Sequence, residues 1–173
     1  AVFGGVAVEG SPPHKGSANR FVRMTQAANV KGQALSAANL DRALLLMDEL
    51  PGVAVVGNLV PGQNPGETNL VLSVSDQATL VGRITTDNAG SRTTGANRLQ
   101  IYLQANSPLG WGDQLDVNAL KTQGSDFGRL ALSVPVGYDG LRAGLHTSRL
   151  QYQLLSSFSD LNASGTATAA GLD

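Results

Sequence analysis

The spacing of hydrophobic residues changes near residue 78 of this 173-residue chain. Before that point, two segments repeat apolar side chains every three or four positions, which is the period of one helix face. We therefore expect helices over Asn19–Ala28 and Ala37–Leu50. Ser36 stands where a helix N-cap is needed, and Pro51 with Gly52 ends the second helix.

Three shorter segments of the same region predict strands, because they are rich in β-branched residues or alternate in polarity. They are Val6–Gly10, Val53–Val60 and Leu70–Val74, and a turn rich in Pro and Gly separates the last two. The predicted order is strand, helix, helix, strand, strand. This order indicates a small α+β domain, for which we expect the bounds 1–77.

Beyond residue 78 no helical period of any length occurs, and short segments alternate apolar and polar residues between turns. We expect about five strands, which lie over Thr79–Thr86, Arg98–Ala105, Gln114–Ala119, Arg129–Val134 and Leu141–Thr147. In the last of these the alternation changes parity near Ser148. Evenly spaced strands of this kind predict an antiparallel meander over 78–173, as part of a sandwich or a barrel.

The two faces of these predicted strands differ in chemistry. One face carries Leu, Ile, Val and Ala with no Lys and no Glu, and the other carries mainly Gln, Asn, Ser, Arg and Asp. A lipid-facing wall disfavours charge, by about 2–4 kcal/mol for Arg or Lys near the bilayer midplane. A soluble antiparallel sheet keeps charge off its core side in the same way, so the pattern fits both environments.

Composition narrows the function classes. Charged residues make up 14% of the chain and the net charge is −1, so no excess of Lys and Arg is present to bind nucleic acid. The absence of Cys excludes disulfides, thiolate catalysis and Cys-based zinc sites. No apolar run is long enough for a transmembrane helix, whereas barrel strands leave little trace in hydropathy. The chain begins with Ala1 rather than Met, as we expect of a mature end or a cut piece.

The sequence contains few residues that could serve in catalysis or hold a cofactor. The two histidines, His14 and His146, are too few for a His-rich zinc site, and carboxylates at ligand spacing are missing. A triad of His146, Asp139 and a serine is arithmetically possible, but no Gly-x-Ser-x-Gly motif accompanies it. The glycines of Gly62–Gly66 lack the Lys-Ser/Thr of a phosphate loop. We expect no catalytic residues, no metal and no cofactor.

The most unusual segment follows the first strand after residue 78. By local chemistry it predicts a tight turn, because Asp, Asn and Gly tolerate positive φ and bond to nearby backbone. Its motif residues are Asp87, Asn88, Gly90, Ser91, Thr94 and Gly95.

That motif resembles the start of the barrel in outer-membrane transporters of two-partner secretion, the family of haemolysin- and filamentous-haemagglutinin-secreting proteins. Upstream, the sequence resembles the last polypeptide-transport-associated (POTRA) domain of those transporters, at Leu50–Val53, Leu59–Gly62 and Gly66–Leu70. Later segments agree in order along nearly the whole chain: Asn106 with Gly110 and Asp113, Val134–Val136, Gly140 with Gly144, and Phe158 with Leu161–Ala167.

The resemblance implies an outer-membrane translocator that exports an unfolded exoprotein without hydrolysis. Residues 1–77 would be a periplasmic POTRA domain that takes extended segments at a strand edge and in the groove beside the second helix, through Val53, Val55, Leu59, Leu40 and Leu44. Residues 78–173 would begin the barrel in contact with outer-membrane lipid, and the polar strand face would line the pore with Arg98, Gln100, Gln104, Asp116, Asn118 and Arg129.

Family members have sixteen barrel strands and an earlier POTRA domain, so the resemblance implies that this chain is a fragment. Two open sheet edges predict that such a fragment dimerises or aggregates. A second interpretation is a soluble β-rich binding or adhesin-like domain with a small α/β module, which should be monomeric and fold alone. A third is an enzyme with an unrecognised site.

Overall fold

The computed structural model describes residues 1–10, 15–155 and 160–173, and these residues form two compact units. The first unit contains Ala1–Thr79 together with two later turns, Asn106–Asp113 and Val134–Arg142. The second contains Leu80–Ala105, Gln114–Ser133 and Ala143–Asp173. His14 and Phe158, which the sequence singles out, lie outside the described residues.

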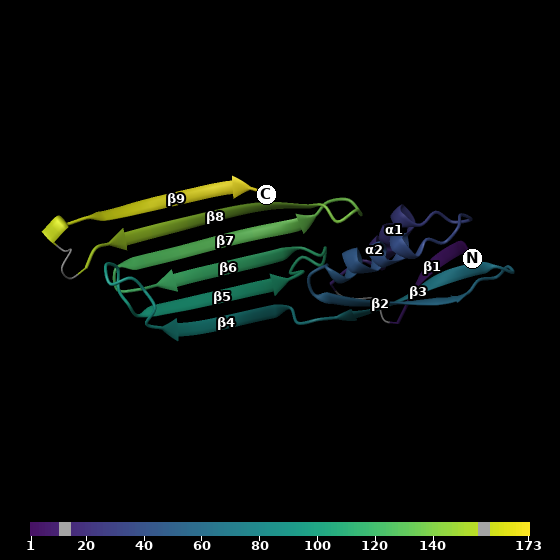
Figure 1. The fold of residues 1–173 in the computed structure, drawn as a ribbon, viewed down its shortest axis with the longest axis horizontal. Coiled ribbons are helices and arrows are strands. Elements are labelled where there is room, and N and C mark those ends of the chain that lie inside the picture. Colours follow the sequence, from purple (N-terminus) through teal and green to yellow (C-terminus); the bar gives the residue numbers. More distant parts are fainter. Residues whose placement is uncertain (11–14, 156–159) are drawn as a thin grey trace. The chain divides into compact units, whose positions relative to one another are not determined.

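The first unit runs in the order β1, α1, α2, β2, β3 (Figure 1). The bounds of these elements are β1 Val2–Glu9, α1 Ala18–Ala28, α2 Ala37–Asp48, β2 Val53–Pro61 and β3 Glu67–Asp76. Among the described residues, the sheet has the order β1-β3-β2, with β1 parallel and β2 antiparallel to β3. The strand that comes last in sequence therefore lies in the centre of the sheet.

Both helices form where the apolar period places them. The hydroxyl of Ser36 accepts a hydrogen bond from Asn39 N at 3.4 Å, so Ser36 is the predicted N-cap of α2. The helix ends at Asp48, earlier than the predicted Leu50, because Leu50 N bonds to Met47 O in a tighter turn. Within the described residues, no helix combines the length and the apolar character needed to cross a membrane.

The core of the first unit lies between the two helices and one face of the three strands. Fully or nearly fully buried side chains come from every element, and the largest are Phe3, Phe21, Met47, Leu70 and Leu72. The predicted apolar stripes of both helices thus supply one side of this core.

The second unit is an antiparallel meander, as predicted, and Figure 1 shows its strands side by side in chain order. Within the described residues the strands are β4 Leu80–Asp87, β5 Arg98–Asn106, β6 Gln114–Lys121, β7 Ser125–Pro135, β8 Arg142–Gln153 and β9 Ser164–Leu172. The expected number of about five is one too few. The sequence of β9 is mostly Thr, Ala and Gly, so its alternation carries no large apolar residue that would reveal a strand.

Two expectations about the strand faces are wrong. The parity of β8 does not change near Ser148, because β8 pairs with β9 without interruption from Leu145↔Leu172 to Gln153↔Ser164. It is the chemistry of one face that changes along the strand. Strand β6 also continues to Lys121, which lies on the same face as Val117 and Ala119, so the apolar face does carry a lysine.

The turn Asn106–Asp113 of the first unit is held by a buried carboxylate. Asp113 is fully buried, and its side chain accepts hydrogen bonds from Leu109 N at 3.1 Å and Trp111 N at 3.1 Å. Ser107 adopts a positive φ of 52° and its hydroxyl accepts a bond from Gly112 N at 2.9 Å. Asp113 therefore fixes the turn rather than serving as a free acid.

Candidate functional site

Strand β2 is an edge strand of the first unit, since its neighbour among the described residues is β3 alone. Even-numbered residues of β2 bond to β3, as shown at the two ends by the bonds Gln77 N to Gly52 O and Gly62 N to Glu67 O. The backbone groups of odd-numbered residues therefore point away from β3. An edge of this kind can pair with another extended segment.

Not all of this outward edge is available. The N–H of Val55 donates to Asp48 Oδ1 at 3.1 Å, so a side chain at the end of α2 already occupies that position. Pro61 has no N–H to offer. The donors of Gly57 and Leu59 remain between these two limits. The accessible edge is therefore short, and we call Gly57–Leu59 the open segment.

Gly57 lets α2 approach β2 closely. A Cβ atom at Gly57 would lie 2.7 Å from Leu44 Cδ2 and 3.1 Å from Leu70 Cδ1. Because side chains alternate along a strand, Val55 and Leu59 lie on the same face of β2 as Gly57, toward α2. Leu59 is 51% exposed there.

The five residues predicted for the edge and groove are thus divided by burial. Leu44 lies beside Gly57, and Val55 and Leu59 share the face of Gly57, whereas Leu40 and Val53 are almost fully buried in the core. On the opposite face of β2, Val56 is 60% exposed, a position that the sequence pattern does not single out.

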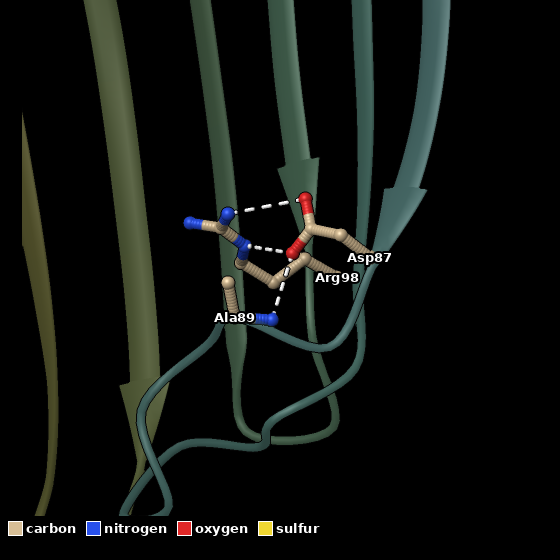
Figure 2. Close-up of polar contacts among 3 residues, drawn as sticks. All are labelled: Asp87, Ala89 and Arg98. Carbon is tan, nitrogen blue, oxygen red and sulfur yellow. Dashed lines mark hydrogen bonds and ion pairs between the residues drawn. The ribbon is translucent and has the colours of Figure 1, made fainter.

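The motif after β4 forms a braced loop (Figure 2). Arg98 Nε donates to Asp87 Oδ1 at 2.7 Å and Nη2 donates to Oδ2 at 3.1 Å, so the pair is bidentate and joins the last residue of β4 to the first of β5. Asp87 Oδ1 also accepts a bond from Ala89 N at 2.9 Å, which turns the chain.

Gly90 and Gly95 of the motif stand where a larger residue would clash or would strain the backbone. A Cβ at Gly90 would lie 2.3 Å from the carbonyl oxygen of Gly95, and Gly95 itself has a φ of 111°. Asn88 is exposed, and no contact with another described residue explains its place in the motif.

The loop Asn88–Asn97 reaches across other strands of its own unit. Thr94 O accepts bonds from Gly124 N at 2.7 Å and from Thr122 Oγ1 at 2.6 Å, in the β6–β7 turn. Thr93 O accepts a bond from Leu155 N at 2.8 Å, beyond the end of β8. The loop between β4 and β5 is therefore hydrogen-bonded to the β6–β7 turn and to the segment after β8, at one end of the sheet.

All six predicted polar-face residues share one face of the sheet. Arg98, Gln100 and Gln104 follow two-residue steps on β5, and the pairing of Asn118 with Arg129 joins β6 to β7 on the same side. Tyr102 Oη donates to Asp116 Oδ1 at 3.1 Å, which places β5 and β6 together. Gln114 Nε2 also donates to the Asp116 carboxylate, at 2.9 Å. Tyr102 and Gln114 belong to the same polar network, and parity alone could have placed them there.

The opposite face carries exposed large hydrophobic residues on most strands. Pairing within each hairpin, and one groove lined by Leu99, Ala119, Gly128 and Arg149, place them on one side: Leu80, Ile84, Leu99, Leu103, Leu130, Leu145 and Leu172.

The candidate catalytic residue His146 contacts Asp173, not Asp139, which the triad considered from the sequence would require. His146 Nδ1 lies 2.9 Å from Asp173 Oδ2, and Asp139 instead belongs to a turn of the first unit. In the described part of the chain, no cluster of three His, Asp or Glu residues could hold a metal ion.

The turn Val134–Arg142 contacts both helices of the first unit. Arg20 Nη2 donates to Gly137 O at 2.8 Å, and Arg23 Nη1 donates to Tyr138 Oη at 2.9 Å. Both guanidinium carbons also lie 5.7–5.8 Å from the centre of the Tyr138 ring. A Cβ at Gly140 would meet the side chain of Leu46, from α2, at 2.5 Å. We call the contacts of Arg20 and Arg23 with Tyr138 the tyrosine clamp.

A sheet of antiparallel strands with one apolar and one polar face has the surface pattern of an outer-membrane β-barrel wall. The sequence model of the haemolysin secretion/activation protein family ShlB/FhaC/HecB matches residues 66–173, which is more than half of the chain. The chain belongs to this family, and is a member of the two-partner secretion transporters.

Individual relatives agree with this membership. The chain is 26% identical, over 88% of its length, to the heme/hemopexin transporter protein HuxB of Haemophilus influenzae strain 86-028NP, and 25% identical over 80% to the outer membrane transporter CdiB of Dickeya dadantii strain 3937. The structure of CdiB from Escherichia coli has the same fold over 98% of the chain, with a TM-score of 0.69 and 19% identity. The chain spans about a quarter of the two curated relatives, 27% and 26%, and 31% of that structure.

Proposed function

We propose that this chain is part of an outer-membrane translocator in which residues 1–77 form a periplasmic POTRA-like domain and residues 78–173 form the first strands of a transmembrane β-barrel. The domain binds an unfolded exoprotein partner, and the barrel exports it without hydrolysis. The open segment of β2 carries this proposal, because an edge strand is a ready template for an extended polypeptide.

The short edge supports transient binding. Gly57 and Leu59 each offer one outward N–H and one outward C=O. A typical backbone hydrogen bond contributes only about 0.5–1.5 kcal/mol net, because it replaces bonds to water. Backbone bonding is also independent of the partner's side chains, so successive segments of one unfolded chain can occupy the same edge. A carrier that releases each segment onward requires binding of this weak and unspecific kind.

The apolar face of the second unit supports contact with lipid. Ile84 is 70% exposed and Leu145 53% exposed, and monomeric soluble proteins rarely leave a continuous surface of such side chains open to water. The polar face, with Arg98, Asp116 and Arg129, would then line the aqueous pore. A soluble adhesin-like domain would need another element to cover the apolar side.

The edge is tested by Leu59→Pro in the full-length gene product, with Leu59→Ala as the matched control. Proline removes an outward N–H without touching the ladder to β3, whereas alanine removes only the side chain. We expect Leu59→Pro to reduce secretion of the partner exoprotein at least tenfold, and Leu59→Ala to reduce it less than threefold. Secretion at the wild-type level by a stably folded Leu59→Pro variant would contradict binding at this edge.

The membrane assignment is tested by cell fractionation. The full-length gene product should sediment with outer membranes and show heat-modifiable mobility in gels. A product that stays in the soluble fraction would favour the adhesin-like alternative.

A further inference from the structure

The apolar face of the second unit changes character toward one end of the sheet. On β8, Leu145 is followed at two-residue steps by Thr147, Arg149 and Gln151, which lie on the same face because β8 is regular. Arg149 is exposed. A cation therefore stands on the face that the proposed function turns toward lipid.

A groove lies beside Arg149 on this face. It has a volume of about 460 Å³, and Leu99, Ile101 and Ala119 give it an apolar lining. Gly128 also lines it and leaves it open, since a Cβ atom built there meets no atom within 4 Å. We call this space the Gly128 groove.

The charged residues at the groove leave one positive charge in excess. Lys121 Nζ lies 2.6 Å from Asp126 Oδ1, so these two charges offset each other. Among the residues that the structure describes, the side chain of Arg149 has no hydrogen bond or ion pair. Arg149 can therefore offer its planar guanidinium to an anion, and it is the side chain best shaped to bind phosphate through two parallel hydrogen bonds.

We propose that the Gly128 groove binds one phosphorylated lipid, with an acyl chain along Leu99, Ile101 and Ala119 and its phosphate on Arg149. Gln151, which also lines the groove, supplies an amide donor beside the guanidinium. A lipid of this chemistry matches both the apolar lining and the unpaired cation, and it compensates a charge that hydrocarbon alone would disfavour.

The position of the groove along the sheet indicates which leaflet of the membrane, and therefore which lipid, it faces. It adjoins the ends of β6 and β7 at the turn 122–124, whereas the turns at the other strand ends, Asn106–Asp113 and Val134–Arg142, belong to the first unit. If the first unit is periplasmic, which this step takes from the proposed function, the groove faces the outer leaflet. The lipid is then the phosphorylated lipid A part of lipopolysaccharide.

Native mass spectrometry of the purified full-length protein in detergent tests the proposal, with lipid A and zwitterionic phosphatidylethanolamine as the two probes. We expect the wild-type protein to retain one lipid A molecule and to retain phosphatidylethanolamine at least tenfold less. Arg149→Gln removes the charge. Gly128→Leu puts an apolar side chain into the groove at a position where a Cβ atom meets no atom within 4 Å and φ is not positive. Each should lower lipid A retention at least tenfold, and Arg149→Lys less than Arg149→Gln. Arg129→Gln, on the opposite face, should retain lipid A as the wild type does.

Equal retention of the two lipids by the wild type would overturn the proposal, as would wild-type retention by Arg149→Gln. Heat-modifiable mobility of each variant verifies that its barrel is formed, and Arg149→Gln keeps the test valid if Gly128→Leu fails to fold.

Secretion and fractionation of the same proteins distinguish failure of the groove proposal from failure of the proposed function. Normal secretion without selective lipid A binding contradicts the groove alone, whereas a product outside the outer membrane contradicts the proposed function.

Discussion

Arg23 and Tyr138 lie 115 residues apart in sequence, and Arg23 Nη1 donates a hydrogen bond to Tyr138 Oη at 2.9 Å while its guanidinium carbon lies 5.8 Å from the ring centre. Arg20 also contacts this turn, through a hydrogen bond to Gly137 O and through the same ring. The turn between β7 and β8 is thus bound to α1, within the first unit.

Loss of the tyrosine clamp should loosen α1. Tyr138→Phe removes one hydrogen bond, worth about 1 kcal/mol, and Tyr138→Ala also removes ring packing and two cation–π contacts, for a total of about 2–3 kcal/mol. We expect amide hydrogen exchange of α1 in the full-length protein to rise about fivefold in Tyr138→Phe and at least thirtyfold in Tyr138→Ala. Unchanged protection of α1 in Tyr138→Ala would show that the clamp does not stabilise the helix.

The contact between Gly57 and α2 should make even a methyl group costly. Gly57→Ala places a Cβ 2.7 Å from Leu44 Cδ2, and overpacking of this kind destabilises by about 1–3 kcal/mol. Gly5→Ala, on β1, is the matched control because its Cβ meets no atom within 4 Å. Limited proteolysis of the first unit should be faster in Gly57→Ala than in Gly5→Ala. The reverse order of cleavage rates would contradict the close approach of α2 and β2.

The bidentate pair of Arg98 with Asp87 should be sensitive to geometry as well as to charge. Asp87→Ala leaves both Arg98 and Ala89 N without this partner, so we expect protease cleavage within 88–97 to become faster. Arg98→Lys keeps the charge but loses the two-pronged contact, and should give an intermediate rate. The exchanged pair, Asp87→Arg with Arg98→Asp, should recover part of the protection. Cleavage of this loop at the wild-type rate in Asp87→Ala would refute the bracing role.

Gly90 should be the least replaceable residue of that loop. A Cβ there would meet two backbone oxygens, of Gly95 at 2.3 Å and of Ala96 at 2.8 Å, and backbone cannot move aside as a flexible side chain can. We expect Gly90→Ala to lower the yield of heat-modifiable full-length protein severalfold, whereas Gly128→Ala should leave the yield unchanged. Equal yields of the two variants would show that the loop tolerates rearrangement.

Local patterns predicted much of each unit because the physical causes are local. The cap at Ser36 and the apolar stripe of α2 depend on residues within a few positions, and the structure has both. Two-residue alternation likewise predicts that Arg98, Gln100 and Gln104 share one face, and in β5 they do. Where the side chains are small, as in β9, alternation of polarity leaves no signal that predicts a strand.

Alternation does not determine the faces of β8 near Ser148, because a change of polarity along one face looks the same in sequence as a change of face. Continuous pairing with β9 decides between the two, and that pairing spans residues far apart in the chain. The same holds for Lys121, whose face depends on how far β6 continues beside β7.

By itself, the sequence determined the helices, most of the strands, the polarity of their faces and the resemblance to two-partner secretion transporters, since each of these is written in residue type and short-range spacing. Only the tertiary structure decided that β3 lies between β1 and β2, which leaves β2 at the edge with a short open segment between Asp48 and Pro61. It also decided that Tyr138 binds α1 and that Arg149 stands beside a groove on the apolar face. These features depend on strand order and on contacts between distant segments, where no local period constrains the outcome.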